Sequence, residues 1–402
     1  DSSTSRGLGD VYKRQHLDSP RSEPLRIAIV AGEASGDALG AAFITAIRER
    51  HPQAEFRGVA GPRMQAAGCQ ALAKSEELAV MGLFEVVRHL PRLWRLRRRL
   101  IEQVNAWQPD VFVGIDAPSF NVGLARQLKQ RGVRTVQYVS PQLWAWRQGR
   151  ARDMHRSCDL VLCVLPFEPP FYAGHGVEAE FVGHPLADQI PLESQRAQAR
   201  LALGIDAQAR IVALLPGSRS GEVQRLAPDM LAAARLLAQR DPSIQFLAPM
   251  ASPAARSAFD GAGAMPSGLR LLDGQARLVL QAADVALVAS GTATLEALLC
   301  KCPMAVVYRF GPLTAALLRW FRLVKLPYFS LPNLLAGEPL VPEFFQDAVQ
   351  PAALADALQE SLGSGAQHEA LQERFTDIHR SLRVDGARRA AAAVLRRIGI
   401  DV

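Results

Sequence analysis

Residues 215–219, Leu-Pro-Gly-Ser-Arg, have the composition of a turn that binds phosphate. Gly217 lets the backbone approach a ligand closely. Ser218 adds a hydroxyl group, and Arg219 adds a permanent charge whose donors match phosphate oxygens. A helix that begins after this turn would point free amide groups and the positive end of its dipole at an anion. The stretch predicts a phosphate site, although a Gly-Ser turn between a strand and a helix also occurs without any ligand.

A second stretch of this kind lies further along the chain, at residues 289–297. Its glycine and hydroxyl residues resemble a helix start, and Glu296 carries a carboxylate that can accept hydrogen bonds from both hydroxyls of a ribose. The simpler interpretation is a Ser or Thr N-cap with an acid in the first turns. Two such turns at strand ends of one sheet converge on one crevice, so together they predict a nucleotide-diphosphate site. Besides Glu296, the site would use Ser290, Gly291, Thr292 and Thr294.

Asp116 is the candidate base in the first half of the chain. It ends the apolar run 111–115, and α/β sheets place their chemistry at such carboxyl ends of strands. Transfer of a group to a hydroxyl needs a base that takes the hydroxyl proton, and a carboxylate can do this. The alternative is an aspartate that caps the next turn, since Pro118 follows closely.

Other polar and aromatic residues follow expected strands of the first half. Two tryptophans beside a Pro turn can stack on a sugar or acyl face, or they can fill a core. A Gly-His-Pro segment can present a histidine to a phosphate or sugar, or pack it at a hinge. An early Gly-containing turn offers either ligand contacts or a helix cap. The residues are Trp144, Trp146, His184, Ser35, Gly36 and Asp37.

The sequence contains no Asp-x-Asp pair, the usual means of holding a divalent cation on a diphosphate. Arg219 and the helix starts would then have to stabilise the departing nucleotide alone. We therefore expect neither a metal nor a cofactor.

An apolar stretch, residues 78–87, runs directly into the arginine-rich stretch 88–99. A basic amphipathic helix beside an apolar flap is typical of a protein that lies on anionic lipid. The alternative is a solvated helix whose apolar side packs on the sheet. A second mixed stretch, 313–335, favours an acylated substrate or a membrane surface as well. The residues predicted to face lipid are Met81, Leu83, Phe84, Arg92, Trp94, Arg95, Arg97, Arg98 and Arg99.

Short apolar runs alternate with longer helical patterns, and many runs are continuous, as in parallel strands buried on both faces. We expect strands at 26–31, 55–59, 111–115, 134–139, 160–164 and 181–182, and a second series at 211–215, 244–248, 269–272, 285–288 and 305–308. The predicted fold class is α/β, with two Rossmann-like, doubly wound parallel-sheet domains and a cleft between them.

The expected division of the chain follows from these series. Residues 1–24 are polar and aperiodic, and we expect a disordered or non-native tail. Residues 25–190 would form a Rossmann-like N-terminal domain that binds the acceptor substrate and associates with the membrane. Residues 191–350 would form a Rossmann-like C-terminal domain that binds the nucleotide sugar. Residues 351–402 are expected to be helices that cross back to the first domain.

The bulk properties fit a globular protein with an anionic partner. The chain has 402 residues and a formal net charge of +7, which suits a phosphorylated substrate, acidic lipid or nucleic acid and chooses none of them. No apolar run reaches the length that spans a bilayer, and no signal peptide precedes the first strand. Five cysteines without metal spacing fit buried thiols in a reducing compartment. We therefore expect a cytoplasmic protein.

The motifs, taken together and in order, resemble the lipid-A-disaccharide synthases. The segments that carry the resemblance are residues 31–37, 58–64, 77–82, 114–118, 138–141, 144–146, 165–168, 183–185, 215–219, 290–296 and 330–337. One departure is Ser119, since the familiar Asp-Ala-Pro-Asp motif has a second acid at that position.

The resemblance implies an inverting GT-B glycosyltransferase that needs no metal. UDP-2,3-diacylglucosamine would donate its sugar to the 6-hydroxyl of 2,3-diacylglucosamine 1-phosphate, giving a β-1,6 disaccharide 1-phosphate and UDP. The family pattern puts the base at Asp116, the phosphate-binding arginine at Arg219 and the ribose contact at Glu296, and it gives Asn333 an active-site role. It also implies a Gram-negative enzyme, peripheral on the cytoplasmic face of the inner membrane, often a homodimer, with no nucleic-acid partner.

Two rival functions stay open at this point. A UDP-sugar epimerase or hydrolase on the same scaffold would share the nucleotide site but need no acyl-binding surface. A non-catalytic nucleotide-sugar binder at the membrane would not depend on Asp116.

Overall fold

The computed structural model describes residues 24–78, 83–146, 148–311, 327–363 and 365–401, with the backbone alone described for 83–90, 145, 146 and 148. The chain divides into two compact units. The first unit comprises the described residues up to 138, together with 156–160 and 391–401. The second comprises 139–155 and 161–390.

The first sheet is parallel, with the order β3-β2-β1-β4-β5-β6-β7 among the described strands. Its strands are β1 (Arg26–Ala31), β2 (Glu55–Ala60), β3 (Cys69–Lys74), β4 (Val111–Ile115), β5 (Arg134–Tyr138), β6 (Leu160–Cys163) and β7 (Ala179–Phe181). The order reverses between β1 and β4, which are hydrogen-bonded neighbours. The turns after these two strands carry residues 32–37 and Asp116, so they flank the position where open α/β sheets bind ligands.

The second sheet is also parallel, with the order β10-β9-β8-β11-β12-β13. Its strands are β8 (Arg210–Leu215), β9 (Ile244–Met250), β10 (Leu269–Asp273), β11 (Val285–Ala289), β12 (Met304–Tyr308) and β13 (Glu343–Phe345). Here the order reverses between β8 and β11, which pair directly. The two glycine-containing turns of the sequence follow these two strands.

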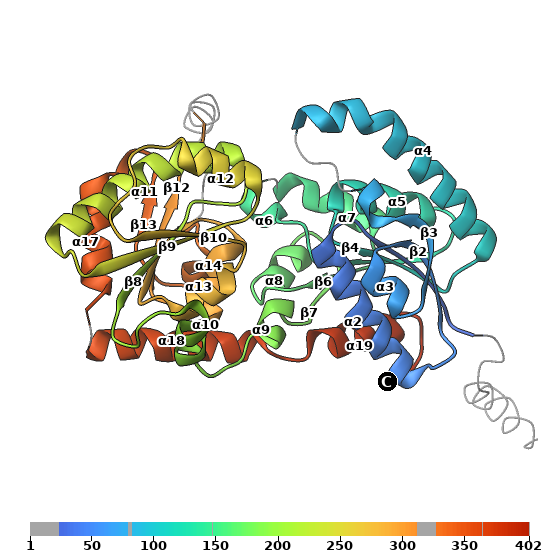
Figure 1. Ribbon diagram of the computed structural model, residues 1–402. Coiled ribbons are helices and arrows are strands. Elements are labelled where there is room, and N and C mark those ends of the chain that lie inside the picture. Colours follow the sequence, from blue (N-terminus) through green and yellow to red (C-terminus); the bar gives the residue numbers. More distant parts are fainter. Residues whose placement is uncertain (1–23, 79–82, 147, 312–326, 364, 402) are drawn as a thin grey trace, which may run out of the picture. The chain divides into compact units, whose positions relative to one another are not determined.

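Among the described elements, helices lie between successive strands, and three more α-helices follow the last strand (Figure 1). The first set is α2 (Ala34–Arg50), α3 (Pro62–Ala66), η1 (Ser75–Glu77), α4 (Leu83–Trp107), α5 (Pro118–Lys129), α6 (Leu143–Trp146), η2 (Gln148–Arg150), α7 (Ala151–Ser157), α8 (Glu168–Ala173) and α9 (Pro185–Gln189). The second set is α10 (Arg196–Leu203), α11 (Ser220–Arg240), α12 (Pro253–Asp260), α13 (Ala276–Ala282), α14 (Thr292–Leu299), α16 (Leu331–Ala336), η3 (Gln346–Ala348), α17 (Pro351–Ser361), α18 (Ala366–Leu382) and α19 (Gly386–Arg397).

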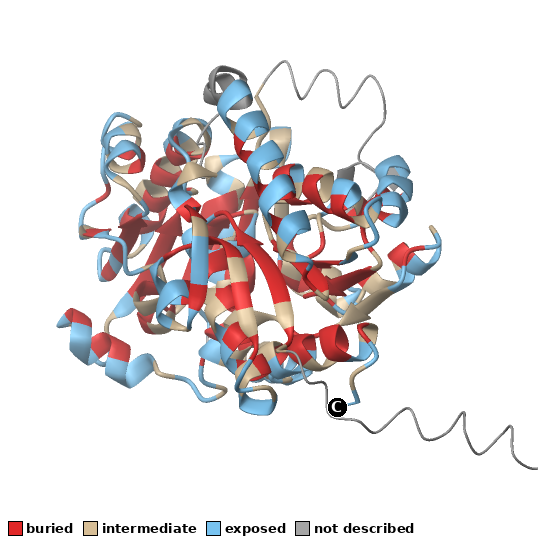
Figure 2. Ribbon diagram, turned by 90° about the vertical axis from the view of Figure 1, so that its right-hand side faces the viewer, coloured by how far each residue is buried: buried red, intermediate tan, exposed pale blue. Residues whose placement is uncertain are grey.

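Strand β8 shows how the second sheet is buried on both faces. Ile211, Ala213 and Leu215 face one apolar core, which α10, α13, α14 and α18 cover. Val212 and Leu214 face another core, which α11, α12 and α17 cover. Figure 2 shows the buried strands and the exposed outer sides of the helices. Continuous apolar runs therefore mark strands covered on both sides, and the predicted α/β fold with two doubly wound sheets is confirmed.

Two strands escaped the sequence prediction, β3 and β13. Both lie at sheet edges, at the ends of the two strand orders. β3 has only two buried positions among exposed and half-buried ones, and β13 has three half-buried residues. Neither forms a continuous apolar run, so the pattern that revealed the central strands is missing.

Two further observations concern the bulk expectations. Among the described residues, no helix is both long and apolar enough to cross a bilayer. The cysteines are all buried and free.

Candidate active site

Asp116 and Ala117 follow β4 in the left-handed region of backbone space, with φ angles of 49° and 40°. Non-glycine residues in this region cost of order 1–3 kcal/mol each and persist only where the surroundings fix them. Such strained positions cluster at functional sites. The conformation therefore sets Asp116 apart from an ordinary strand-end aspartate.

Two buried amide side chains hold the backbone of Asp116 in place. Asn121 Nδ2 donates to the Asp116 carbonyl at 2.8 Å, and Gln137 Nε2 donates to the same oxygen at 3.1 Å. The Asp116 N–H donates to the carbonyl of Tyr138 at 2.9 Å. Asn121 and Gln137 are at most 1% exposed. Neither residue is among the predicted site residues, although Gln137 borders the stretch 138–141 and Asn121 lies three residues after the stretch 114–118.

The environment of Asp116 suits a base. Burial raises the pKa of its carboxyl group, and a hydrogen bond from the Ala117 N–H only partly opposes this. A carboxylate with a raised pKa binds a proton more readily and is a better general base. The side chain is half-buried, so it remains accessible.

Ser119, which stands where the family motif has a second acid, lies beside Arg97 of α4. Arg97 Nη2 donates to the Ser119 carbonyl at 3.3 Å, and its guanidinium lies over the ring of Phe120, 5.0 Å from the centroid. Burial lowers the pKa of Arg97. Arg97, which was itself predicted to face lipid, is half-buried and packs α4 onto α5.

The rest of α4 presents two different faces after Pro91. Leu96, Leu100 and Val104 are buried, whereas Trp94 is 62% exposed. Arg92, Arg95, Arg98 and Arg99 are exposed too. Met81 and the stretch 312–326 lie outside the described residues, and the side chains of Leu83 and Phe84 are not described.

Asp37 has a capping role within the first unit. Its carboxylate accepts hydrogen bonds from the N–H groups of Arg63 at 2.9 Å and Met64 at 3.0 Å, so it caps α3. A Cβ at Gly61 would come within 2.5 Å of this carboxyl group, which explains the glycine there. Asp37 is buried, as is Gly36, while Ser35 is exposed at the start of α2. Of these three, only Ser35 presents its side chain to solvent.

Trp144 is part of a buried network in the second unit. Its Nε1–H donates to Glu168 Oε1 at 3.1 Å, and its ring packs edge-on against Phe167, 4.9 Å between centroids. Ser140 Oγ also donates to Glu168, as does the Leu165 N–H at 3.0 Å. Trp144 is 9% exposed, so it fills a core and leaves no open ring face for a sugar. The side chain of Trp146 is outside the description.

His184 acts as the N-cap of α9. Its Nδ1 accepts a hydrogen bond from the Leu186 N–H at 3.2 Å. Burial lowers the pKa of His184 to about 4, so the imidazole is neutral near pH 7. Its backbone N–H donates to the Leu382 carbonyl at 3.0 Å. The hinge-packing alternative describes His184 better than a charged phosphate contact does.

The turn after β8 has the geometry of a phosphate site. Gly217 has a φ angle of 115°, and a Cβ there would come within 2.3 Å of the Glu222 carboxylate. Ser218 and Arg219 are exposed, and Arg219 occupies the N-cap position of α11. The N–H groups of Glu222 and Val223 donate to the Arg219 carbonyl at 2.9 and 3.0 Å. The exposed residues Ser218 and Arg219 at the helix start are placed to meet an anion, which the positive end of the α11 dipole would favour.

The turn after β11 lies beside it, because β8 and β11 pair directly. Gly291 is the N-cap of α14, and both Gly291 and Thr292 are exposed. Thr294 Oγ1 donates to the Gly291 carbonyl at 2.7 Å and is buried, so it shapes the turn. Glu296 is half-buried, and Arg277 Nε donates to its carboxylate at 3.2 Å.

Burial raises the pKa of Tyr308, at the end of the adjacent strand β12. The charge of Glu222 adds to this rise, while Arg225 and Arg219 oppose it. These charges gather around the β8 turn. Ser290 Oγ donates to the Phe329 carbonyl at 3.0 Å, and this bond ties the second turn to the segment before α16.

The chain is similar to known proteins in sequence and in structure. A family model described as lipid-A-disaccharide synthetase matches residues 27–396. A lipid-A-disaccharide synthase of Sodalis glossinidius is 52% identical over 379 residues, covering 93% of this chain and 98% of the relative. The chain belongs to the lipid-A-disaccharide synthase family. It is therefore a glycosyltransferase of lipid A biosynthesis, with sugar-nucleotide and lipid-linked substrates.

Solved structures agree on the fold of this synthase family. A calicheamicin glycosyltransferase has a TM-score of 0.58 at 16% identity, covering 94% of this chain and 99% of its own. A UDP-GlcNAc 2-epimerase from Neisseria meningitidis, solved with UDP-GlcNAc, has a TM-score of 0.65 at 11% identity, covering 93% and 100%. The predicted GT-B architecture is confirmed. The epimerase shows that the fold alone does not separate transfer from epimerisation; the family does.

Asn333, to which the family pattern gives an active-site role, has a buried side chain that hydrogen-bonds within the protein. The side chain is 1% exposed, and its amide nitrogen donates to the Val341 carbonyl and to Glu343 Oε1, each at 2.9 Å. Its amide oxygen accepts from the Val341 N–H at 2.8 Å. Both amide hydrogens are therefore used within the protein, and direct contact with a reacting group is not the role this geometry supports.

Proposed function

We propose that the enzyme transfers 2,3-diacylglucosamine from its UDP donor to the 6-hydroxyl of 2,3-diacylglucosamine 1-phosphate with inversion at the anomeric carbon. The observation that carries the nucleotide part is the direct pairing of β8 with β11. This pairing brings the turn with Arg219 beside the helix start with Glu296, at the carboxyl ends of the two strands. The family to which the chain belongs supports the assignment of acylated sugars as donor and acceptor.

The nucleotide site assigns separate tasks to its two turns. The turn with Gly217, Ser218 and Arg219 binds the diphosphate through amide groups and one guanidinium. The turn after β11 contributes Gly291 and Thr292, and Glu296 accepts the ribose hydroxyls. Charge develops on the leaving diphosphate during transfer, so the preorganised donors of α11 and Arg219 stabilise the transition state.

Asp116 takes the proton from the acceptor hydroxyl as that oxygen attacks the anomeric carbon. Its raised pKa and fixed backbone support this role, and a positioned base typically contributes 10²–10⁴-fold to rate. The proton moves to the Asp116 carboxylate, and UDP leaves with the electron pair of the broken bond. Ser119 is not an acid, so in this chain the position after Pro118 supplies no second base.

The reaction is proposed to proceed without a metal ion, because Arg219 and the start of α11 supply the positive charge that a cation would bring. Turnover should be unchanged after exhaustive treatment with EDTA. A loss that Mg²⁺ restores would show that the diphosphate needs a cation.

We also propose that α4 binds the cytoplasmic face of the inner membrane and that the chain forms a homodimer. Exposed Trp94 and the four exposed arginines of α4 support the first part, since aromatic and basic side chains suit an anionic lipid surface. The second part rests on the resemblance to the family.

Mass spectrometry of the product made from synthetic donor and acceptor tests the proposal. The expected products are the disaccharide 1-phosphate and UDP in equal amounts, with UDP release dependent on the acceptor. UDP released without disaccharide would favour the hydrolase alternative.

A further inference from the structure

Glu343, at the start of the edge strand β13, gathers hydrogen bonds from three directions. Its carboxylate accepts from the N–H of Phe329 at 3.1 Å, from the N–H of Ser330 at 2.9 Å and from Asn333 Nδ2 at 2.9 Å. These donors lie before and within the first turn of α16. A carboxylate that accepts amide hydrogen bonds at a helix start satisfies groups that otherwise have no partner.

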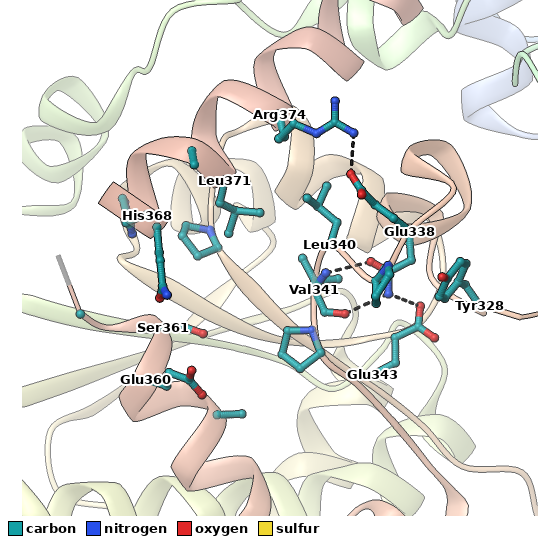
Figure 3. A pocket seen from close by; sticks show the side chains of 18 residues that line it. Tyr328, Glu338, Leu340, Val341, Glu343, Glu360, Ser361, His368, Leu371 and Arg374 are labelled. Carbon is teal, nitrogen blue, oxygen red and sulfur yellow. Dashed lines mark hydrogen bonds and ion pairs between the residues drawn. The ribbon is translucent and has the colours of Figure 1, made fainter. Parts of the chain in front are cut away.

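Asn333 completes the same network from inside α16. Its side-chain amide forms hydrogen bonds with both the N–H and the carbonyl of Val341, two residues before Glu343. Its backbone N–H donates to Ser330 Oγ at 3.5 Å. Figure 3 shows the bonds that reach Val341 and Glu343, on one wall of a pocket of about 960 Å³. Ser330 is fully buried. The segment 329–333 and the strand β13 are thus locked together.

The segment locked in this way touches the nucleotide turn. The carbonyl of Phe329 accepts the hydrogen bond of Ser290 Oγ at 3.0 Å, while the N–H of Phe329 donates to Glu343. One residue therefore joins Glu343 to Ser290. The ring of Phe329 also packs on Phe345 of β13, 5.6 Å between centroids, which restrains it further.

We propose that Glu343 and Asn333 are positioning residues for nucleotide binding, acting through Phe329 on the turn that begins at Ser290. This rests on the proposed function, in which that turn binds the UDP part of the donor. Asn333 contributes to the reaction by holding Glu343 and Val341, and it touches no reacting group. The network explains why residues remote from the diphosphate turn in sequence belong to the site.

The test measures UDP binding by calorimetry and steady-state kinetics on the full chain. Glu343→Gln removes the charge at nearly constant volume, and Ser290→Ala removes the link on the other side of Phe329. We expect each to weaken UDP binding and raise the donor KM, by about tenfold for Glu343→Gln, as suits loss of hydrogen bonds to a charged group. The acceptor KM should change little.

The double variant, Ser290→Ala with Glu343→Gln, separates a shared path from two independent effects. If Glu343 acts through Ser290, the Kd of the double variant for UDP should lie within about twofold of the Kd of Glu343→Gln alone. Additive losses would overturn the proposal. Ser290→Ala removes only one half-buried hydroxyl, so UDP binding by this variant can still be measured if Glu343→Gln fails to fold.

Glu338→Gln is the matched control. Glu338 lies on the same pocket wall but is exposed and pairs with Arg374 at 2.6 Å, away from the 329–333 segment. It should leave UDP affinity and both KM values unchanged. Unchanged UDP affinity in Glu343→Gln, or an equal rise of both KM values with a lowered Tm, would contradict the positioning role. If the parental protein itself does not bind UDP, the proposed function fails first.

Discussion

Arg277 Nε lies 3.2 Å from Glu296 Oε1, and this ion pair orients the carboxylate assigned to the ribose. The side chains are 39% and 21% exposed, so the pair contributes little to stability. Its consequence is geometric: one oxygen of Glu296 is held by α13, which fixes how the carboxylate presents itself at the start of α14.

Replacing Glu296 by Ala should abolish the preference for a ribose over a 2′-deoxyribose. The parental enzyme is expected to bind UDP about tenfold more tightly than 2′-deoxy-UDP, since a hydrogen bond to a charged group is lost. In Glu296→Ala the two affinities should become equal. Calorimetric titration of both nucleotides makes the comparison, and a preference that survives in the variant would remove Glu296 from the ribose site.

Arg277→Gln should reduce that preference only in part, because Glu296 remains but loses its orientation. Arg256→Gln is the matched control, since Arg256 forms a similar exposed ion pair with Asp273 at 2.7 Å. An identical response of the two arginine variants would show that the Arg277 pair is an ordinary surface contact.

Asp116→Asn should lower kcat by at least roughly 10²-fold while UDP binds as before. Asn suits the left-handed backbone at this position, where φ is 49°, so the fold should be preserved. The base acts ionised, so parental kcat/KM should rise with pH as the carboxyl loses its proton. Because burial raises its pKa, this rise should lie above the range of an ordinary carboxyl group.

The pH profile of kcat/KM is the measurement that checks this assignment. The rising limb should be missing from the residual activity of Asp116→Asn. A variant that keeps both the limb and most of the parental rate would place the base elsewhere.

The sequence revealed the parts of the fold that depend on continuous apolar runs. The central strands on both sides of β1 and β8 are buried on both faces, so their composition marks them without knowledge of neighbours. The edge strands β3 and β13 lack that pattern. Their positions depend on pairing with β2 and β12, which only the folded chain supplies.

The site divides in a similar way. Glycine and arginine turns, and an acid at a strand end, are local patterns, so Gly217, Arg219 and Asp116 could be named in advance. Whether Trp144 meets a ligand or a core depends on Glu168, which lies 24 residues away in sequence. The same holds for Asn333, whose partner Glu343 comes from a strand that the sequence did not reveal.

The half-buried, neutral His184 should make stability depend on pH. Its pKa is about 4 in the folded chain against 6.5 for a free histidine side chain, so between these pH values the unfolded chain binds more protons. The contribution of His184 to the free energy of unfolding is fully present above about pH 6.5. It is lost as the pH falls toward 4, and the loss is at most roughly 3 kcal/mol. Urea unfolding of the parent and of His184→Asn measures it.

The difference in unfolding free energy between parent and His184→Asn should shrink as the pH falls. Asn can still cap α9, so the variant isolates the titration from the cap. His155→Asn, at an exposed position, gives the reference for losing one histidine. A difference that stays constant from pH 7 to pH 4 would mean that His184 is not the titrating group.

Membrane binding should depend on the exposed face of α4 and not on Arg97. Replacing Trp94, Arg95 and Arg99 by Ser should reduce the fraction of protein that sediments with vesicles containing anionic phospholipid. Added salt should likewise reduce the fraction of parental protein that sediments. Arg97→Ser should leave vesicle binding intact and lower the unfolding free energy instead, since Arg97 packs on Phe120. Arg126→Ser with Arg131→Ser, two exposed arginines outside α4, controls for the loss of charge. Equal losses in the α4 and control variants would show that net charge alone attracts the lipid and that α4 is an ordinary solvated helix.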